Sequence, residues 1–185
     1  KHKKPDEPPF LTSEVSETDE KTFELFKRGD SVAVFQFESP GMQKILREFQ
    51  PEKIEDLVAL NALYRPGPMD CIPQYIEGKW KPETIHYPDP ALEDLLKETY
   101  GVMVYQEQIM KVAQIIAGFS LGGADMLRRA MGKKKPEVLM GKKKDFVEGA
   151  LKNGHTEKHA EEIFDIMVPF AGYGFNKSHA AAYSV

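Results

Sequence analysis

The chain has 185 residues, of which 41% are hydrophobic and 29% charged, with a formal net charge of −4. These values are ordinary for a soluble globular protein of one or two small domains. The single cysteine, Cys71, excludes an internal disulfide framework and favours a reducing cytosol, and no apolar run is long enough to span a bilayer.

The first half of the chain reads as a linker followed by short helices. Residues 1–18 are rich in Lys and Pro and then in Ser, Thr and Glu, so we predict a linker there and one helical domain over 19–185. The alternation over 32–37 allows a short strand, and a packed turn fits almost as well. Capping residues, prolines and helical spacing predict helices over 19–28, 40–49, 51–63, 71–80 and 91–97.

The second half predicts longer helices separated by glycines. An apolar stripe from Tyr105 predicts a helix that Gly118 ends, and Ser120 is placed to cap the next helix. Pro136 begins a long helix that Asn153 and Gly154 end, and Thr156 caps another. Asn176 or Ser178 caps a last helix, and the fold class is therefore mainly α. The chain begins without Met and ends at Val185 in mid-pattern, so we expect a piece of a longer protein.

The stretch 128–144 concentrates positive charge in an acidic chain. It holds eight cations and one anion, Glu137, so the rest of the chain carries −11. We expect Asp125 to pair with Arg129, four residues on, and Arg128 to have no partner within a turn. Such clustering suits a polyanion, and a solvated helix surface is the open alternative. The cations are Arg128, Arg129, Lys133, Lys134, Lys135, Lys142, Lys143 and Lys144.

Two corners could also face a ligand. Gly172 and Gly174 allow a tight turn before a helix N-terminus, which favours an anion, and a cap without a ligand is the alternative. Tyr64 and Arg65 precede a rigid Pro-Gly-Pro turn that could contact nucleic acid or could be a connector, and their spacing favours the connector.

Other chemistry is weakly supported. No Asp stands two positions from another, as a two-metal carboxylate cluster would need. His155 and His159 have helical metal-ligand spacing, but Gly154 and Thr156 place His155 outside the helix, so we expect solvated histidines and no metal. Cys71 has no histidine nearby in the sequence and is expected to be a plain, partly buried thiol.

Four stretches together resemble the C family of bacterial replicative DNA polymerases, the DNA polymerase III alpha subunits. The resemblance covers 18–185 and places this piece in the fingers region, beginning at the edge of the palm. It implies templated addition of deoxynucleotides to a primer, with the catalytic aspartates and their Mg²⁺ upstream of this piece, which should itself be inactive. The stretches are 64–68, 105–108, 121–135 and 170–183.

The resemblance also implies roles for individual residues. We expect Arg128, Arg129 and Lys133 at the triphosphate of the incoming dNTP. Primer–template DNA is the other expected ligand; the sliding clamp and other replicase subunits would bind mostly outside this piece, and no membrane partner is expected. The second nucleotide group is Lys177, His179, Tyr173 and Asn176, and the candidates for DNA are Tyr64, Arg65, Lys134 and Lys135. Lys142, Lys143 and Lys144 depart from the family's pattern and are expected only as surface charge or as contacts to the DNA backbone.

Two other functions stay open at this point. A self-standing nucleic-acid-binding module would use the same basic patch and show a steep salt dependence without nucleotide preference. A structural helical domain would bind neither ligand. The four stretches in the family's order favour the polymerase fragment, located in the bacterial cytoplasm.

Overall fold

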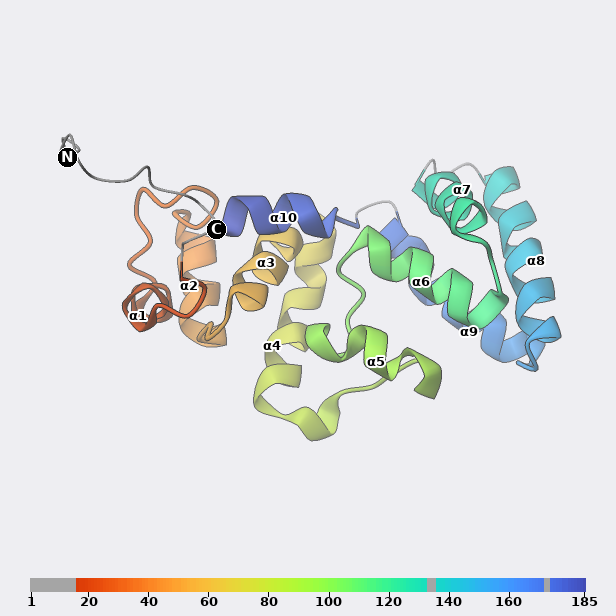
Figure 1. The fold of residues 1–185 in the computed structure, drawn as a ribbon, viewed down its shortest axis with the longest axis horizontal. Coiled ribbons are helices and arrows are strands. Elements are labelled where there is room, and N and C mark those ends of the chain that lie inside the picture. Colours follow the sequence, from red (N-terminus) through yellow and green to blue (C-terminus); the bar gives the residue numbers. More distant parts are fainter. Residues whose placement is uncertain (1–15, 133–135, 172–173) are drawn as a thin grey trace, which may run out of the picture.

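A computed structural model describes residues 16–132, 136–171 and 174–185 of the chain. Its described part is mainly helical with almost no strand (Figure 1), as the sequence predicts, and no described helix is long and apolar enough to cross a membrane. The α-helices are α1 Glu20–Arg28, α2 Pro40–Phe49, α3 Ile54–Leu63, α4 Ile72–Trp80, α5 Glu93–Leu96, α6 Gln106–Ala117, α7 Leu121–Gly132, α8 Pro136–Lys152, α9 Glu157–Ala171 and α10 Lys177–Ser184. Short 3₁₀ turns are η2 Pro68–Cys71, η3 Pro82–Thr84, η4 Pro90–Leu92 and η5 Lys97–Thr99.

The helices enclose two hydrophobic cores. The first core combines buried side chains of α1 to α4 with residues 102, 104 and 105 and with Ala180 of α10. The second core combines α5 to α9, with Ile109, Val112 and Ile116 of α6 fully buried between its neighbours. In Figure 1 the two groups of helices lie side by side, and α10 returns along α3 so that the C-terminus lies beside α2.

The helix ends follow the predicted capping residues. Asp19 caps α1 by accepting a hydrogen bond from the Thr22 N–H at 2.9 Å, and Asn176 caps α10 through the His179 N–H at 2.9 Å. Gly118 ends α6 with a φ of 68°, a left-handed conformation that costs glycine little. Contacts within a few residues of each helix end therefore set these helix boundaries.

The structure decides one open alternative and corrects one helix start. Of the strand and the packed turn considered for residues 32–37, the structure shows turns, because Ala33 and Gln36 have positive φ angles of 64° and 70°, which a strand does not allow. The helix predicted from residue 51 begins at Ile54. The Glu52 N–H donates to the Asp56 carboxylate at 2.9 Å, which holds the preceding residues in a turn.

The segment 102–106 connects the two cores. Val104 and Tyr105 pack in the first core and Met103 in the second. A parallel β-bridge joins Tyr105 to Phe175, with the Gln106 N–H donating to the Phe175 carbonyl at 3.0 Å. The bridge thus fixes the start of the last helix against the junction of the cores.

A buried glutamine fixes the same junction from the other side. The Gln108 Oε1 accepts from the Val104 and Tyr105 N–H groups at 2.8 and 3.0 Å, and its Nε2 donates to the Thr99 hydroxyl at 2.9 Å. Because these groups are buried, leaving any of them unpaired would cost free energy. The start of α6 is therefore held in one position.

A buried ion pair anchors α4 to the start of α3. Lys79 Nζ lies 3.3 Å from Asp56 Oδ2, with the two side chains 8% and 1% exposed. The same ammonium donates to the Gln50 carbonyl at 2.6 Å and lies 4.4 Å from the centre of the Phe49 ring. The Lys79 charge is therefore satisfied on several sides. Removing Lys79 would leave the buried Asp56 carboxylate with a backbone N–H but no cation beside it.

Helix α8 approaches the end of α6 closely. A Cβ at Gly149 would overlap the carbonyl oxygen of Ala117, and the Asn153 side chain donates to the Ile116 carbonyl at 3.0 Å. Gly141, on the same helix, has open space where a Cβ would lie. Close helix packing therefore requires glycine at position 149, whereas packing does not require it at position 141.

Substitution of either member of the buried pair should destabilise the fold strongly. We expect Lys79→Met or Asp56→Leu to lower the free energy of unfolding by about 3–5 kcal/mol, and the double variant to lose less than the sum of the two. Urea unfolding followed by circular dichroism measures this. As the control, Lys44→Ala breaks an exposed pair with Glu48 and should cost under about 1 kcal/mol. Equal losses in Lys79→Met and Lys44→Ala would contradict the anchoring role.

Alanine at the two glycines of α8 should act in opposite directions. Gly149→Ala must push α8 away from α6 and should lower the free energy of unfolding by about 1–3 kcal/mol. Gly141→Ala only removes a flexible residue from a helix interior and should raise it by about 0.5–1 kcal/mol. Thermal unfolding of the two variants compares them directly, and the same sign for both would be the contrary result.

Candidate functional site

Both predicted arginines of α7 bind one carboxylate. Arg128 Nη2 lies 2.8 Å from Asp125 Oδ1, and Arg129 Nε lies 2.8 Å from Asp125 Oδ2. The expected Asp125–Arg129 pair is confirmed, and the expectation that Arg128 lacks a partner is wrong. It overlooked that residues three apart also share a helix face.

The two guanidinium groups differ in exposure. The Arg128 side chain is 19% exposed and the Arg129 side chain 68%. Hydrogen bonds from Arg128 and then Arg129 hold the pKa of Asp125 below its ordinary value, so this carboxylate stays ionised at neutral pH. One anion thus orients two cations, which leaves a net positive charge with Arg129 facing solvent.

The described lysines of the basic stretch are paired along α8 and with α9. Lys142 contacts Asp145 at 2.8 Å, and Lys143 contacts Asp165 of α9 at 3.0 Å. Lys144 is 78% exposed and has only a long contact of 3.9 Å with Glu148. The basic stretch is therefore partly neutralised by neighbours, least so at Lys144. Lys133, Lys134 and Lys135 lie outside the described residues.

The N-terminus of α10 holds a second group of predicted residues around an internal carboxylate. Glu107 of α6 accepts from the Asn176 side-chain amide at 2.7 Å and from the Lys177 backbone N–H at 3.2 Å. The Lys177 ammonium contacts Glu98 at 2.7 Å. The predicted anion position at this helix end is thus filled by a carboxylate of the chain itself. Tyr173, expected at this corner, lies outside the described residues.

Arg65 belongs to this corner. Its guanidinium lies 4.1 Å from the centre of the Phe175 ring, and its Nε donates to the Ala62 carbonyl at 3.0 Å. Partial burial lowers the pKa of Arg65 from its ordinary, very high value. His179 also contacts Phe175, with ring centres 5.2 Å apart. Phe175 therefore brings together two cationic or titratable side chains that lie far apart in the sequence.

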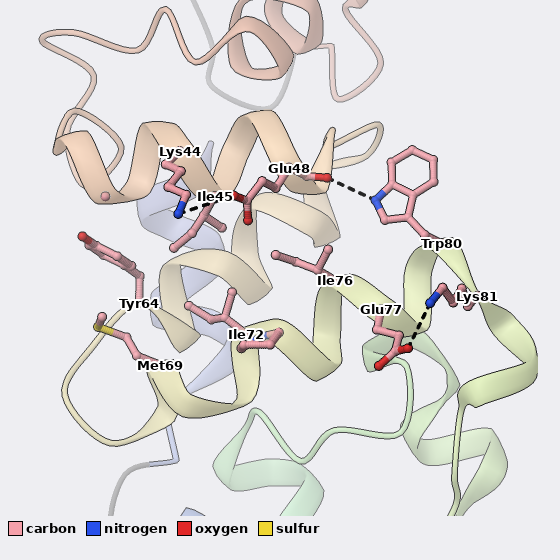
Figure 2. A pocket seen from close by; sticks show the side chains of 12 residues that line it. Lys44, Ile45, Glu48, Tyr64, Met69, Ile72, Ile76, Glu77, Trp80 and Lys81 are labelled. Atoms are coloured by element: carbon pink, nitrogen blue, oxygen red, sulfur yellow. Dashed lines mark hydrogen bonds and ion pairs between the residues drawn. The ribbon is translucent and has the colours of Figure 1, made fainter.

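Tyr64 lines a different feature, a pocket of about 660 Å³ between α2 and α4 (Figure 2). Met69, Ile72 and Ile76 give the pocket an apolar floor, and Trp80 lies at the end opposite Tyr64. The Tyr64 hydroxyl accepts from the Ser39 hydroxyl at 3.3 Å. Tyr64 and Arg65 are consecutive, yet only Arg65 reaches the α10 corner. Nearby, Cys71 is half-buried, and burial raises the pKa of its thiol, as a plain structural cysteine would show.

The two acidic members of the α10 group were not predicted from the sequence. Glu107 lies in the quoted stretch 105–108 but received no role, and Glu98 stood in no motif. A charge count along the chain cannot find them, because Glu98 and Lys177 are 79 positions apart. Only the return of α10 to the junction brings them together.

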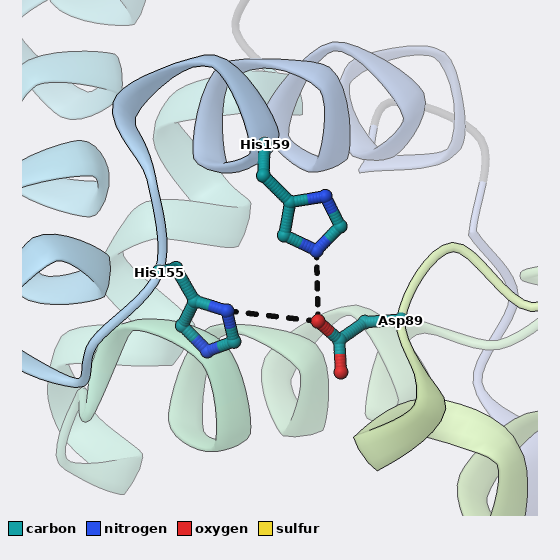
Figure 3. A group of neighbouring side chains, drawn as sticks. All are labelled: Asp89, His155 and His159. Carbon is teal, nitrogen blue, oxygen red and sulfur yellow. Dashed lines mark hydrogen bonds and ion pairs between the residues drawn. The ribbon is translucent and has the colours of Figure 1, made fainter.

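The two histidines expected to be solvated are instead partly buried against an aspartate. Figure 3 shows His155 and His159 directed at Asp89, whose carboxylate accepts from His159 at 2.8 Å. His155 does lie outside the helix, two residues before α9 begins. Among the described residues, these three form the one group whose spacing could hold a metal ion.

Comparison with known proteins assigns the chain. A family model described as the bacterial DNA polymerase III alpha subunit finger domain matches residues 2–154. DNA polymerase III subunit alpha of Treponema pallidum is 66% identical over 95% of the chain and 15% of that protein. The subunits of Borreliella burgdorferi and Bacillus subtilis are 57% and 52% identical, over 96% and 94% of the chain and 16% of each protein.

The chain thus spans about one sixth of the length of these relatives. The family match covers most of the chain, including α7 with its arginine pair and the buried glutamine of α6. The mainly helical architecture agrees with this assignment. The chain belongs to the family of bacterial DNA polymerase III alpha subunit finger domains.

Proposed function

We propose that this fingers domain serves templated DNA synthesis within an intact bacterial DNA-directed DNA polymerase. It holds the triphosphate of the incoming dNTP and contacts the primer–template, while the aspartates that carry out nucleotidyl transfer lie elsewhere in the parent. The isolated chain is therefore inactive. The parent works in the bacterial cytoplasm, and its sliding clamp and other replicase subunits bind mostly outside this chain.

The observation that carries the proposal is the arginine pair on α7. Asp125 holds two guanidinium groups in fixed positions, and Arg129 presents most of its side chain to solvent. A guanidinium matches the geometry of phosphate oxygens in a forked hydrogen bond. A pre-oriented pair with net positive charge suits the triphosphate better than a single mobile cation does.

A protein catalyses phosphoryl transfer mainly by positioning the reactants and neutralising their charge, and it contributes little covalent chemistry. Cations on a helical domain that closes over a correct base pair would do both and would also exclude water. Lys177 and His179, at the N-terminus of α10, form a second group proposed to face the nucleotide. Asn176 and Tyr173 are proposed to shape the nucleotide-binding pocket there.

Contacts to DNA are assigned to the remaining cations. Lys144 is the best placed, because it is exposed and weakly paired. Lys142, Lys143 and Arg65 would first have to leave internal partners. Lys133 is proposed at the triphosphate, and Lys134, Lys135 and Tyr64 complete the proposed DNA set.

Mg²⁺ is expected in the intact polymerase, and the one candidate metal group among the described residues does not suit it. The one group of three metal-ligating side chains in the described residues contains two imidazoles, whereas Mg²⁺ prefers oxygen ligands. We therefore place the Mg²⁺ ligands outside this chain.

Loss of Arg129 should weaken nucleotide use without disturbing the fold. In the intact polymerase, we expect Arg129→Ala to lower kcat/KM for the dNTP by about 10- to 100-fold, as the loss of a hydrogen bond to a charged group implies. Steady-state primer extension at varied dNTP concentration measures this. Arg28→Ala, which removes an exposed, paired arginine of α1, is the matched control and should have no effect. Unchanged kinetics in Arg129→Ala would rule out the assignment.

Neighbouring lysines of α8 should differ in their effect on DNA binding. We expect Lys144→Ala to reduce the slope of log K against log salt by about 0.9, the effect of one phosphate contact. Lys143→Ala should reduce the slope less than Lys144→Ala does, because the Lys143 ammonium has to leave Asp165 before it can contact a phosphate. A fluorescence-anisotropy salt titration with labelled primer–template compares them, and identical slopes in the wild type and both variants would exclude these DNA contacts.

The same titration separates the proposal from a self-standing nucleic-acid-binding module. If the matching dNTP strengthens binding and the Arg128→Ala/Arg129→Ala variant loses that effect, the fingers assignment is supported. If DNA binds with a steep salt slope but neither the dNTP nor the arginines matter, the basic surface only follows the DNA backbone.

A further inference from the structure

Three metal-ligating side chains converge at one place in the second half of the fold (Figure 3). Asp89 comes from the segment that leads into η4, and His155 comes from the loop between α8 and α9. His159 lies in the first turn of α9. Two segments that are 70 positions apart in the sequence therefore meet at these residues.

The distances suit a small tetrahedral ion. The Asp89 Oδ2 lies 2.8 Å from His159 Nε2 and 3.6 Å from His155 Nδ1, and all three ligand atoms lie within 4.8 Å of one another. Zinc with ligands near 2.0–2.1 Å separates neighbouring ligand atoms by roughly 3.4 Å. Small rotations of the side chains would bring the three atoms to this spacing.

The surroundings also favour metal binding. The Asp89 side chain is 10% exposed, and those of His155 and His159 are 21% and 33% exposed, so the group is sheltered yet reachable from solvent. The other carboxylate oxygen, Oδ1, accepts from the Ala91 N–H at 2.8 Å, which leaves Oδ2 directed at the histidines. A ligand oriented by such a second contact needs little reorganisation when it binds an ion.

We propose that Asp89, His155 and His159 form a binding site for a divalent transition-metal ion of the zinc class. Two imidazoles and one carboxylate are the donors that zinc takes readily, and three protein ligands leave one position for water. The ion fastens the segment before η4 to the start of α9. Because Mg²⁺ prefers oxygen ligands, these two imidazoles and one carboxylate would favour zinc over Mg²⁺.

The test uses zinc alone on the metal-free 185-residue chain. We expect isothermal titration calorimetry to show one Zn²⁺ per chain and the thermal midpoint to rise with Zn²⁺ concentration. Co²⁺ in place of Zn²⁺ should give the intense visible absorption of four-coordinate cobalt with nitrogen and oxygen ligands.

Variants locate the ion. His155→Gln and His159→Ala should each weaken Zn²⁺ binding about 100-fold or more, since even outer partners of a metal site change affinity by 10- to 100-fold. Asp89→Asn keeps the contact with the Ala91 N–H but loses the anionic ligand, and should also weaken binding. His86→Asn, in the same loop as Asp89 but outside the cluster, is the control and should bind as the wild type does.

Two results would overturn the proposal. One is the absence of a saturable, single-ion transition in the wild type, which would leave a hydrogen-bonded cluster only. The other is wild-type affinity in folded His155→Gln and Asp89→Asn chains, which would place the ion elsewhere. Circular dichroism of every variant confirms folding, and three independent ligand changes keep the test decisive if one of them unfolds.

Discussion

The arrangement of this domain depends on the pairing of residues 104–106 with 174 and 175. The bridge between Tyr105 and Phe175 lies where the two cores meet, and Gln108 fixes the same strand-like segment from the other side. It ties α10 to the first core after the chain has completed the second one. Few backbone hydrogen bonds attach α10 to the first core. The buried side chain of Gln108 and the packing of Ala180 against α3 therefore contribute much of this attachment.

Internal pairing governs the charged surface of the domain. The described cations that we propose to contact phosphate are paired with carboxylates of the chain at different distances. Arg128 and Arg129 both pair closely with Asp125, whereas Lys144 has only a long contact with Glu148. A cation that leaves a partner to bind phosphate gains only the difference between two ion pairs. Ligand affinity therefore follows how well each cation is already satisfied, and net charge along the sequence is a poor guide to it.

Local signals were enough to predict much of the fold. Asp19, Gly118 and Asn176 set helix ends through contacts within a few residues, so the sequence displays them directly. The start of α3 was missed because the buried Asp56 carboxylate holds the Glu52 N–H before the helix. The choice between strand and turn at 32–37 stayed open because two positive φ angles decide it. The Asp125–Arg129 pair was predicted from its helical spacing, although the partner of Arg128 was not. The Glu107 and Glu98 contacts join distant segments and have no sequence signal, and the spacing of His155 and His159 did not reveal Asp89, which lies about 70 positions away.

The carboxylate of Glu107 at the start of α10 has a consequence for anion binding. The positive end of the helix is already neutralised, and the Asn176 amide and Lys177 N–H already have an acceptor. Any anion that binds there exchanges with an internal group of the same charge, and Glu107 can return when the anion leaves. Competition with Glu107 would lower the affinity of this helix end for a free anion, so phosphate in solution would not accumulate there.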